Sequence, residues 1–283
     1  MSDNFVRVVE VGARDGLQNE PEIVPTADKV RFIELLADAG FSEVEVSSFV
    51  NPKRVPQLAD AAEVFAALAP RPNTRYTALV PNYKGLERAL ASHVKSIALF
   101  TAASETFTER NIGMSIAESL QTFRDLMPQA KAADLRVRAY VSMAFHCPYE
   151  GKIVPLQVVP IVRGLLALGV DEISLGDTIG HAIPQEVAEL SNALDGILPL
   201  SQFAYHFHDT KHTALANVEQ ALSDSVRIFD SSAGGLGGCP FAPGASGNLA
   251  TEELLALLHT RGYETGVDLN KVYRATAFLR NRV

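Results

Sequence analysis

Cysteine is scarce in this sequence of 283 residues, and basic side chains are outnumbered. Its two cysteines, Cys147 and Cys239, are too few for a disulfide framework, so we expect a reducing compartment and a cytoplasmic location. Lys and Arg total 25 against 33 Asp and Glu, which gives a net charge of −8. This balance argues against a nucleic-acid partner, because binding to the phosphate backbone needs basic patches.

Long apolar runs are also missing. None approaches the roughly 20 residues that cross a bilayer, so we expect no membrane partner. Residues Met1–Phe5 have neither the basic nor the apolar region of a secretory signal. Hydrophobic residues make up 47% of the chain and charged residues 20%, an ordinary globular composition that argues against disorder.

Eight β-rich segments alternate with amphipathic segments along the chain. The predicted strands are Val6–Gly12, Glu43–Phe49, Thr74–Val80, Val94–Phe100, Arg136–Met143, Asp171–Gly176, Phe203–Asp209 and Arg227–Ala233. Apolar residues at helical spacing predict helices over Ala27–Ala39, Glu118–Ala133, Pro155–Leu168, Pro184–Leu194 and Thr213–Leu222. Asn51–Gln57 and Thr101–Ser115 read as longer connections.

Eight strand–helix repeats of roughly 28 residues predict an α/β fold of the (β/α)8 TIM-barrel type. No linker-like stretch divides the chain, so we expect one domain over residues 1–283. The competing architecture is a doubly wound open sheet. That fold would favour a Gly-x-Gly-x-x-Gly turn after the first strand, and Gly12–Gly16 does not have this pattern.

Unusual polar residues gather where the predicted strands end, which is where barrel enzymes keep their active sites. They are Arg14 and Asp15 after the first strand, Asp177 after the sixth, His206 and His208 on the seventh, and Asn248 beyond the eighth. This convergence predicts one functional site at the carboxyl end of the barrel.

Four of these residues make a candidate metal site. His206 and His208 are two apart on a strand and so face the same side. Barrel closure brings Asp15 beside them, and Asn248 can add an amide oxygen. Mixed oxygen and nitrogen ligands suit Mg²⁺ or Mn²⁺, with Zn²⁺ or Co²⁺ as alternatives. The competing interpretation is a pair of hydrogen-bonded core histidines.

Arg14 and three acidic residues form the rest of the candidate site. A fixed guanidinium at Arg14 can hold an enolate oxygen or a carboxylate, and it can also form an ion pair with Glu45. Glu10 and Glu45 lie within strands, where we expect them to orient Arg14 or a ligand histidine. Asp177 is a candidate orienting group, base or helix N-cap.

Cys239 follows a run rich in glycine, residues 234–238. Such a loop suits a lid or an oxygen-binding turn, and a thiol in it can donate a proton to a carbanion or enolate. Cys147 is expected to line the mouth of the barrel or to pack.

Several motifs resemble the metal-dependent lyases of the 3-hydroxy-3-methylglutaryl-CoA (HMG-CoA) lyase family. They are Glu10–Glu20, Ser47–Lys53, Ala102–Glu105, Cys147–Lys152, Ser174–Gly180, His206–Thr210, Ser231–Phe241 and Gly244–Glu252. They cover nearly the whole chain in order. The resemblance implies a (β/α)8 barrel that cleaves a 3-hydroxyacyl-CoA to acetyl-CoA and a keto acid, and an acyl-CoA partner.

The resemblance also assigns roles to single residues. It implies the metal ligands Asp15, His206, His208 and Asn248, an enolate-stabilising Arg14 and a proton-donating Cys239, with Glu45, Asp177 and Glu252 as supporting acids. The base that takes the substrate hydroxyl proton is His206, Asp15 or a water on the metal. We also expect a homo-oligomer.

The chain departs from the family pattern at the expected rim of the barrel. Lys211, His212 and Thr213 stand where a Tyr-Gly-Gln run is usual, and Met143 and His146 replace a cysteine and a small residue. If these side chains reach the mouth, they shift the preference for the substituent at substrate C3. Acetyl-CoA condensing enzymes, metal hydrolases and a non-catalytic binding barrel are the competing interpretations.

Overall fold

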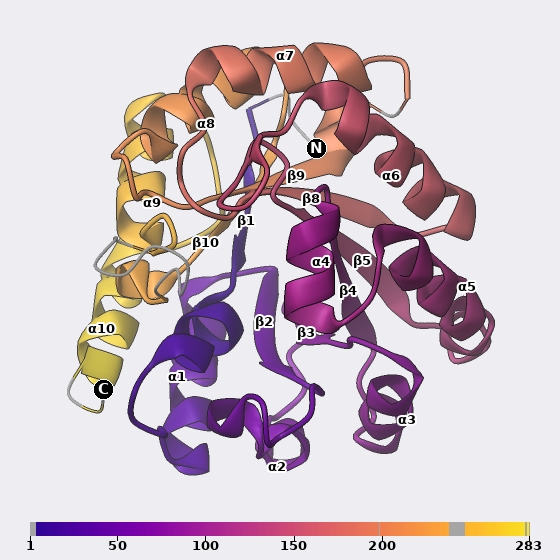
Figure 1. Cartoon of the computed structure of the whole chain (residues 1–283). Coiled ribbons are helices and arrows are strands. Elements are labelled where there is room, and N and C mark those ends of the chain that lie inside the picture. Colours follow the sequence, from indigo (N-terminus) through magenta and orange to yellow (C-terminus); the bar gives the residue numbers. More distant parts are fainter. Residues whose placement is uncertain (1–3, 198, 238–246, 281, 283) are drawn as a thin grey trace.

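Eight parallel strands close into a barrel at the centre of the molecule (Figure 1). This computed structural model describes residues 4–197, 199–237, 247–280 and 282. The barrel strands are β1 (Arg7–Glu10), β2 (Glu43–Ser48), β3 (Arg75–Leu79), β4 (Ser96–Ala102), β5 (Arg136–Ser142), β8 (Glu172–Asp177), β9 (Phe203–Phe207) and β10 (Ile228–Ser231). They run in chain order around the barrel, and β10 pairs with β1 to close it. The predicted fold class is confirmed.

Helices surround the strands. They are α1 (Thr26–Ala39), α2 (Ala61–Ala67), α3 (Tyr83–Ala91), α4 (Glu105–Ile112), α5 (Ile116–Ala132), α6 (Pro155–Leu168), α7 (Pro184–Leu194), α8 (Ala214–Ser223), α9 (Thr251–Thr260) and α10 (Leu269–Arg280). In the part of the chain that is described, no helix is both long enough and apolar enough to cross a membrane.

The predicted longer connection Thr101–Ser115 does link β4 to α5, but it contains a short helix, α4, that was not predicted from the sequence. The Ser104 side chain caps the helix by accepting a hydrogen bond from the Phe107 backbone N–H at 3.1 Å, and Gly113 ends it in a left-handed conformation. A second departure is a short antiparallel hairpin of β6 (His146–Cys147) and β7 (Gly151–Lys152) between β5 and α6. Both additions lie at the carboxyl end of the barrel.

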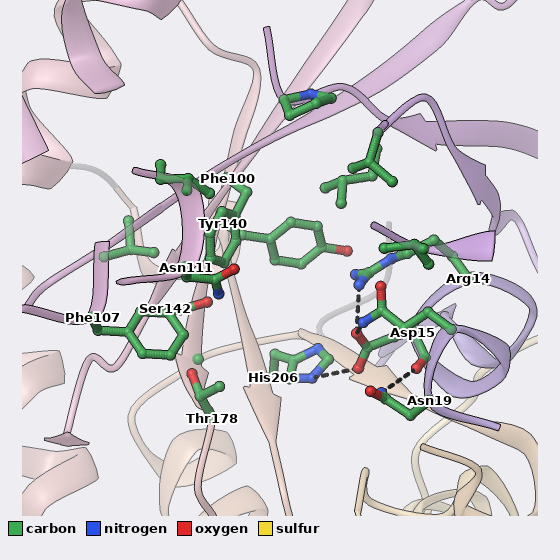
Figure 2. A pocket seen from close by; sticks show the side chains of 18 of the residues that line it. Arg14, Asp15, Asn19, Phe100, Phe107, Asn111, Tyr140, Ser142, Thr178 and His206 are labelled. Atoms are coloured by element: carbon green, nitrogen blue, oxygen red, sulfur yellow. Dashed lines mark hydrogen bonds and ion pairs between the residues drawn. The ribbon is translucent and has the colours of Figure 1, made fainter. Parts of the chain in front are cut away.

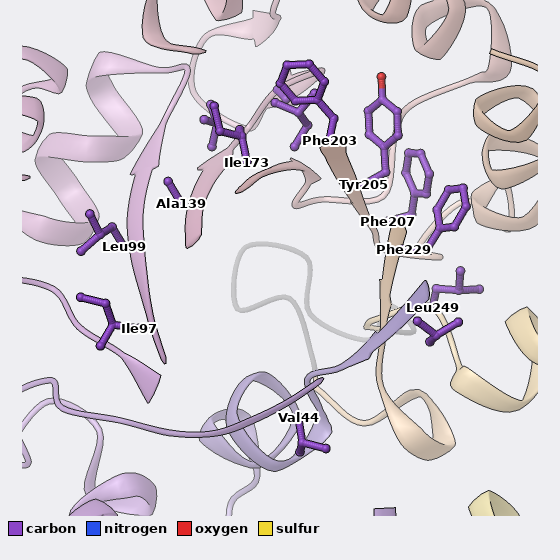
Figure 3. Close-up of a cluster of buried hydrophobic side chains, with 14 of the residues drawn as sticks. Val44, Ile97, Leu99, Ala139, Ile173, Phe203, Tyr205, Phe207, Phe229 and Leu249 are labelled. Carbon is purple, nitrogen blue, oxygen red and sulfur yellow. The ribbon is translucent and has the colours of Figure 1, made fainter. Parts of the chain in front are cut away.

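The main apolar core lies between the barrel and its helices. Figure 3 shows part of it: Phe203, Tyr205, Phe207 and Phe229 project outward from β9 and β10. Tyr205 and Phe207 stack with their ring centroids 5.2 Å apart. Since side chains alternate along a strand, the residues between them face the barrel axis.

The barrel interior is charged at its amino end. Arg7, Glu43, Arg75, Arg136 and Glu172 meet there, one from each of five strands. One layer further in, the fully buried Arg138 binds Glu172 at 2.7 Å and Asp230 at 2.6 Å. Each buried charge has an opposite partner, as burial requires, because an unpaired ion there is strongly destabilising.

Candidate active site

Arg14 and Asp15 are positioned by a tight helical turn, Gly12–Gly16, that follows β1. Backbone N–H groups of both residues donate to the Val11 carbonyl, at 3.1 and 2.7 Å. The turn needs glycine at position 12, since a Cβ there would lie 2.7 Å from the Glu10 carboxylate. Arg14 then pairs with Asp15 through Nη1 and with Glu45 through Nε. The expected pairing of Arg14 with Glu45 is confirmed.

His206 lies on β9 and His208 just beyond it, and both point toward the barrel axis. Their ring centroids are 5.2 Å apart, and both side chains are buried. Phe207, between them, packs outward in the apolar core. The sequence prediction that the histidines share one side is therefore confirmed.

The histidines and Asp15 form a group that fits a metal ion. One ligand atom from each of the three residues lies within 4.8 Å of the other two. Asn248 forms an isolated antiparallel β-bridge with His208, and its side-chain amide nitrogen donates a hydrogen bond to Asp15 Oδ2 at 2.9 Å. Barrel closure thus joins all four predicted ligands, although β1 and β9 are distant in sequence.

Two buried atoms of this group have no hydrogen-bond partner among the described residues, His208 Nδ1 and Asn248 Oδ1. A buried polar atom without a partner costs about 1–3 kcal/mol. Both atoms are of types that bind hard or borderline divalent cations. The residues present therefore fit a divalent cation.

The electrostatics of His208 and Asp15 favour the protonation states that bind metal, whereas for His206 the pKa is lowered by burial but raised above its usual value by Asp230 and Asp15. Burial, followed by the neighbouring His206, lowers the pKa of His208 to about 3, so its imidazole is neutral. Burial raises the pKa of Asp15, but Arg14 and the two histidines lower it to about 2. A neutral imidazole and an ionised carboxylate are the states that bind metal.

Sequence reasoning missed three residues that support the site. Asp230 Oδ2 lies 3.2 Å from His206 Nδ1, and its other oxygen binds Arg138. Arg138 donates to the Tyr140 hydroxyl at 2.9 Å, and that hydroxyl donates to Glu45. The contacts form a closed ring, since Glu45 binds Arg14 and Asp15 lies 3.8 Å from His206.

A signal for these residues was present in the sequence. Arg136, Arg138 and Tyr140 occupy alternate positions of β5, and Asp230 lies inside β10. Polar residues at every second position of an otherwise apolar strand indicate a polar barrel interior. This pattern does not predict that Arg138 pairs with Asp230, because the two residues are 92 positions apart in the sequence.

The supporting acids of the sequence prediction hold loops and side chains in place. Glu10 accepts from the backbone of Gly12 and Ala233 and from the Thr251 hydroxyl. Glu252 accepts from the Gly234 backbone and the Thr276 hydroxyl. Glu10 therefore joins the loops after β1 and β10, where we had expected it to orient Arg14 or a histidine, and Glu252 joins the loop after β10 to α10.

Asp177 is not a helix N-cap. Its carboxylate accepts from the backbone N–H groups of His181 and Ala182, each at 3.0 Å, and α7 begins only at Pro184. Burial raises the pKa of Asp177 to about 6, against the lowering effect of these two hydrogen bonds. Asp177 shapes the loop after β8, and its side chain does not line the pocket.

The two cysteines have different outcomes. Cys147 is buried, and its sulfur lies 3.0 Å from the Ser104 hydroxyl, so it packs as expected. Cys239, the predicted proton donor, lies outside the described residues. Its role stays a prediction.

The rim residues expected to tune C3 preference do not line the pocket. Lys211 is exposed, and the His212 side chain is 82% exposed. Met143 is buried in the apolar core, and His146 binds Glu186 at 2.9 Å. The turn after β9 directs Lys211 and His212 to solvent, and an effect of these residues on the C3 preference stays a prediction.

A pocket of about 230 Å³ opens at the carboxyl end of the barrel (Figure 2). One side is polar and carries Arg14, Asp15, His206 and His208. The other side is largely apolar and is made by Leu79, Pro81, Phe100, Phe107 and Ile112, with Tyr140 between the two sides. Such a pocket can bind a ligand that has an anionic or oxygen-rich end and an apolar body.

Comparisons with known proteins find close relatives among lyases that act on hydroxymethylglutaryl-CoA. The chain is 50% identical over 274 residues to a mitochondrial hydroxymethylglutaryl-CoA lyase of Bos taurus, covering 97% of this chain and 84% of that one. It is 48% identical over 270 residues to a 3-hydroxy-3-isohexenylglutaryl-CoA/hydroxymethylglutaryl-CoA lyase of Pseudomonas aeruginosa, covering 95% and 90%.

A solved structure is similar throughout. It is an HMG-CoA lyase from Acinetobacter baumannii in complex with coenzyme A and 3-methylmalate, with a TM-score of 0.95 and 37% identity over 99% of this chain and 92% of that one. The HMGL-like family model matches residues 5–279. With a closed barrel, a cation-binding group at its carboxyl end and this match over nearly its whole length, the chain belongs to the HMGL-like family.

Proposed function

We propose that this chain is a carbon–carbon lyase that cleaves HMG-CoA to acetyl-CoA and acetoacetate. The observation that carries the proposal is the convergence of Arg14 with the Asp15, His206 and His208 group in one pocket, in a chain half identical to an HMG-CoA lyase. The condensing-enzyme alternative is not favoured, because these relatives are named as lyases.

Asp15, His206, His208 and Asn248 would hold a divalent cation, and we propose Mg²⁺ or Mn²⁺. Such an ion, when bound, polarises substrate oxygens and stabilises the negative charge that develops on them. The four residues supply two oxygens and two imidazole nitrogens, a set that these ions accept.

The reaction begins with loss of the proton from the tertiary hydroxyl of the substrate. Of the candidate bases, we favour Asp15 or a water over His206, because His206 would hold the cation through Nε2 while its Nδ1 lies 3.2 Å from Asp230 Oδ2. Asp230 then orients the His206 ring. The hydroxyl becomes the ketone of acetoacetate as the C2–C3 bond breaks. The bonding electron pair passes to the thioester, as an enolate.

Arg14 stabilises that enolate. Burial lowers the pKa of Arg14, but Asp15 and Glu45 raise it above its usual value, so the guanidinium stays charged. Glu45 fixes its orientation, which lets its donors stabilise the developing charge without reorganisation. Cys239 then donates a proton to C2 of the enolate, which yields acetyl-CoA.

The direct test is product stoichiometry. Purified protein with Mg²⁺ and HMG-CoA is expected to give acetyl-CoA and acetoacetate in equal amounts. A parallel assay with longer 3-alkyl substrates measures the C3 preference. Formation of HMG-CoA from acetyl-CoA and acetoacetate as the favoured direction, or no cleavage of any 3-hydroxy-3-alkylglutaryl-CoA, would contradict the proposal.

A substitution at Cys239 tests its proposed role as the proton donor. Cys239→Ser keeps the size of the side chain but makes it a far weaker acid, so kcat should fall steeply while KM stays close to wild type. We further propose a homo-oligomer in the cytoplasm; the scarcity of cysteine supports the second point.

A further inference from the structure

The amino end of the barrel, opposite the active-site pocket, carries a second hollow of about 540 Å³. It is lined by three arginines, three small polar residues and one proline: Arg7, Arg75, Arg136, Ser42, Asn73, Thr74 and Pro72. No carboxylate and no large apolar side chain is part of this lining. The composition is that of a cationic, hydrogen-bonding surface on a protein with a net charge of −8.

The three guanidinium groups are fixed from behind. The Glu43 carboxylate has no exposed surface, and its oxygens form salt bridges with guanidinium nitrogens of Arg7 at 2.8 Å, Arg75 at 3.1 Å and Arg136 at 3.2 Å. Glu172, 5% exposed, also binds Arg7 and Arg136. The arginine side chains themselves are 16%, 42% and 20% exposed. Their inner edges are therefore neutralised, while the surface they present to the hollow is cationic.

Within the ion-pair network at this end of the barrel, guanidinium groups outnumber carboxylates. Glu172 is shared with Arg138, whose second partner is Asp230, so four guanidinium groups face three carboxylates. Burial lowers the pKa of Arg136, Glu43 and Glu172 raise it, and repulsion from Arg75 and Arg7 lowers it again, so that the pKa lies below its usual value. Among the described residues, the Arg75 side chain makes one hydrogen bond, from Nη1 to Glu43. The N–H groups of Nε and Nη2 can therefore donate to a ligand.

We propose that this hollow binds a tetrahedral oxyanion, a phosphate that is either free or carried as a monoester. Guanidinium groups match phosphate oxygens in geometry and charge, and here buried carboxylates preorganise three of them. Ser42, just before β2, and Asn73 and Thr74, just before β3, add short polar groups to the lining. The site is separate from the proposed lyase chemistry and does not depend on it.

The test is calorimetric titration of the full chain with inorganic phosphate, at an ionic strength held constant with chloride. Arg75→Gln removes the most exposed guanidinium, and Asn73→Asp places a negative charge in the lining while leaving every arginine in place. Arg71→Gln is the matched control, because Arg71 is 39% exposed, pairs with Asp38 and lies outside the lining.

We expect the wild-type chain to bind phosphate and both hollow variants to bind it about tenfold more weakly or worse, as loss of a charged hydrogen bond implies. The control should keep the wild-type affinity. Titration with glycerol phosphate distinguishes a free phosphate from a phosphate monoester. If glycerol phosphate binds and the same two variants weaken that binding, the ligand class is a monoester. If inorganic phosphate binds and glycerol phosphate does not, the ligand is the free ion.

Two results would overturn the proposal. One is the absence of phosphate binding to the wild-type chain beyond the chloride background. The other is unchanged affinity in both Arg75→Gln and Asn73→Asp, which would locate the phosphate elsewhere, including the active-site pocket. Asn73→Asp keeps the test decisive if Arg75→Gln fails to fold, because Asn73 makes no ion pair.

Discussion

Arg14 makes its ion pairs through two different nitrogens, so the effect of its positive charge can be distinguished from the effect of its fixed guanidinium geometry. Nε binds Glu45 and Nη1 binds Asp15. A lysine at this position keeps the charge but has one nitrogen on a flexible stem. The residue therefore offers a clean test of whether fixed orientation matters for stabilising the enolate.

For Arg14→Lys we predict that kcat for acetyl-CoA release falls about 100-fold, as for loss of an oxyanion donor. Steady-state kinetics with saturating Mg²⁺ measure it. A rise in KM with unchanged kcat would instead assign Arg14 to ground-state binding.

Glu10 gives a stability prediction with a pH signature. Burial raises its pKa to about 7 from 4.5, although three hydrogen bonds lower it. Between these two values the folded state binds more protons than the unfolded state, so the contribution of Glu10 to stability falls as pH rises from about 4.5 through about 7.

Glu10→Gln should therefore be more stable than wild type at pH 8, by an amount on the order of 2 kcal/mol, with the difference vanishing toward pH 4. Urea unfolding at several pH values measures this. A difference that is constant across that range would show that the carboxyl does not titrate on folding.

At the scale of the element, side-chain alternation explains what sequence reasoning could reach. His206 and His208 follow from the two-residue period of β9, and barrel closure predicts that Asp15 joins them. Pairings across strands need the register, which no local pattern gives. The parallel register of β10 with β9 sets Asp230 beside His206, and this contact could not be foreseen.

Asp230→Asn tests how far the charged interior stabilises the barrel. The change leaves Arg138 with only Glu172 as its anionic partner and weakens the support of His206. We predict a loss of about 3 kcal/mol in the free energy of unfolding, typical of a buried pair that loses one partner. Asp125→Asn, at an exposed position on α5, is the control, and an equal loss in both would sink the idea.

Gly180, in the loop after β8, and Gly196, in the loop after α7, form a matched pair of glycines. Gly180 has φ +64°, and a Cβ there would lie 2.6 Å from the Thr210 backbone nitrogen, whereas Gly196 has φ +74° and nothing within 4 Å. Both substitutions to alanine incur the left-handed backbone cost of about 1–3 kcal/mol. Only Gly180→Ala adds a clash.

We predict that Gly180→Ala lowers the thermal midpoint more than Gly196→Ala, and that it alone lowers kcat, because Asp177 and Thr210 shape the rim of the barrel mouth. Differential scanning fluorimetry and the lyase assay measure the two effects. Equal behaviour of the variants would mean that the loop adjusts without cost.

At the scale of the whole molecule, the alternation of strands and helices was enough to predict the barrel, because eight repeats of similar length leave few other closed arrangements. The short helix α4 was missed, since six of its eight residues are polar and its Ser104 cap is a local feature. Lys211 and His212 were expected at the substrate, but the direction of a loop after a strand depends on packing that the sequence does not display.

Dependence on a divalent cation is tested most directly by turnover of metal-stripped protein during titration with Mn²⁺. We predict no acetyl-CoA release from HMG-CoA without metal, full recovery in wild type, and recovery in His208→Ala only at Mn²⁺ concentrations at least tenfold higher, since one of four ligands is lost. His212→Ala, exposed on the same segment, should match wild type. Full turnover by rigorously metal-free protein would contradict a cation site at Asp15, His206, His208 and Asn248 that serves catalysis.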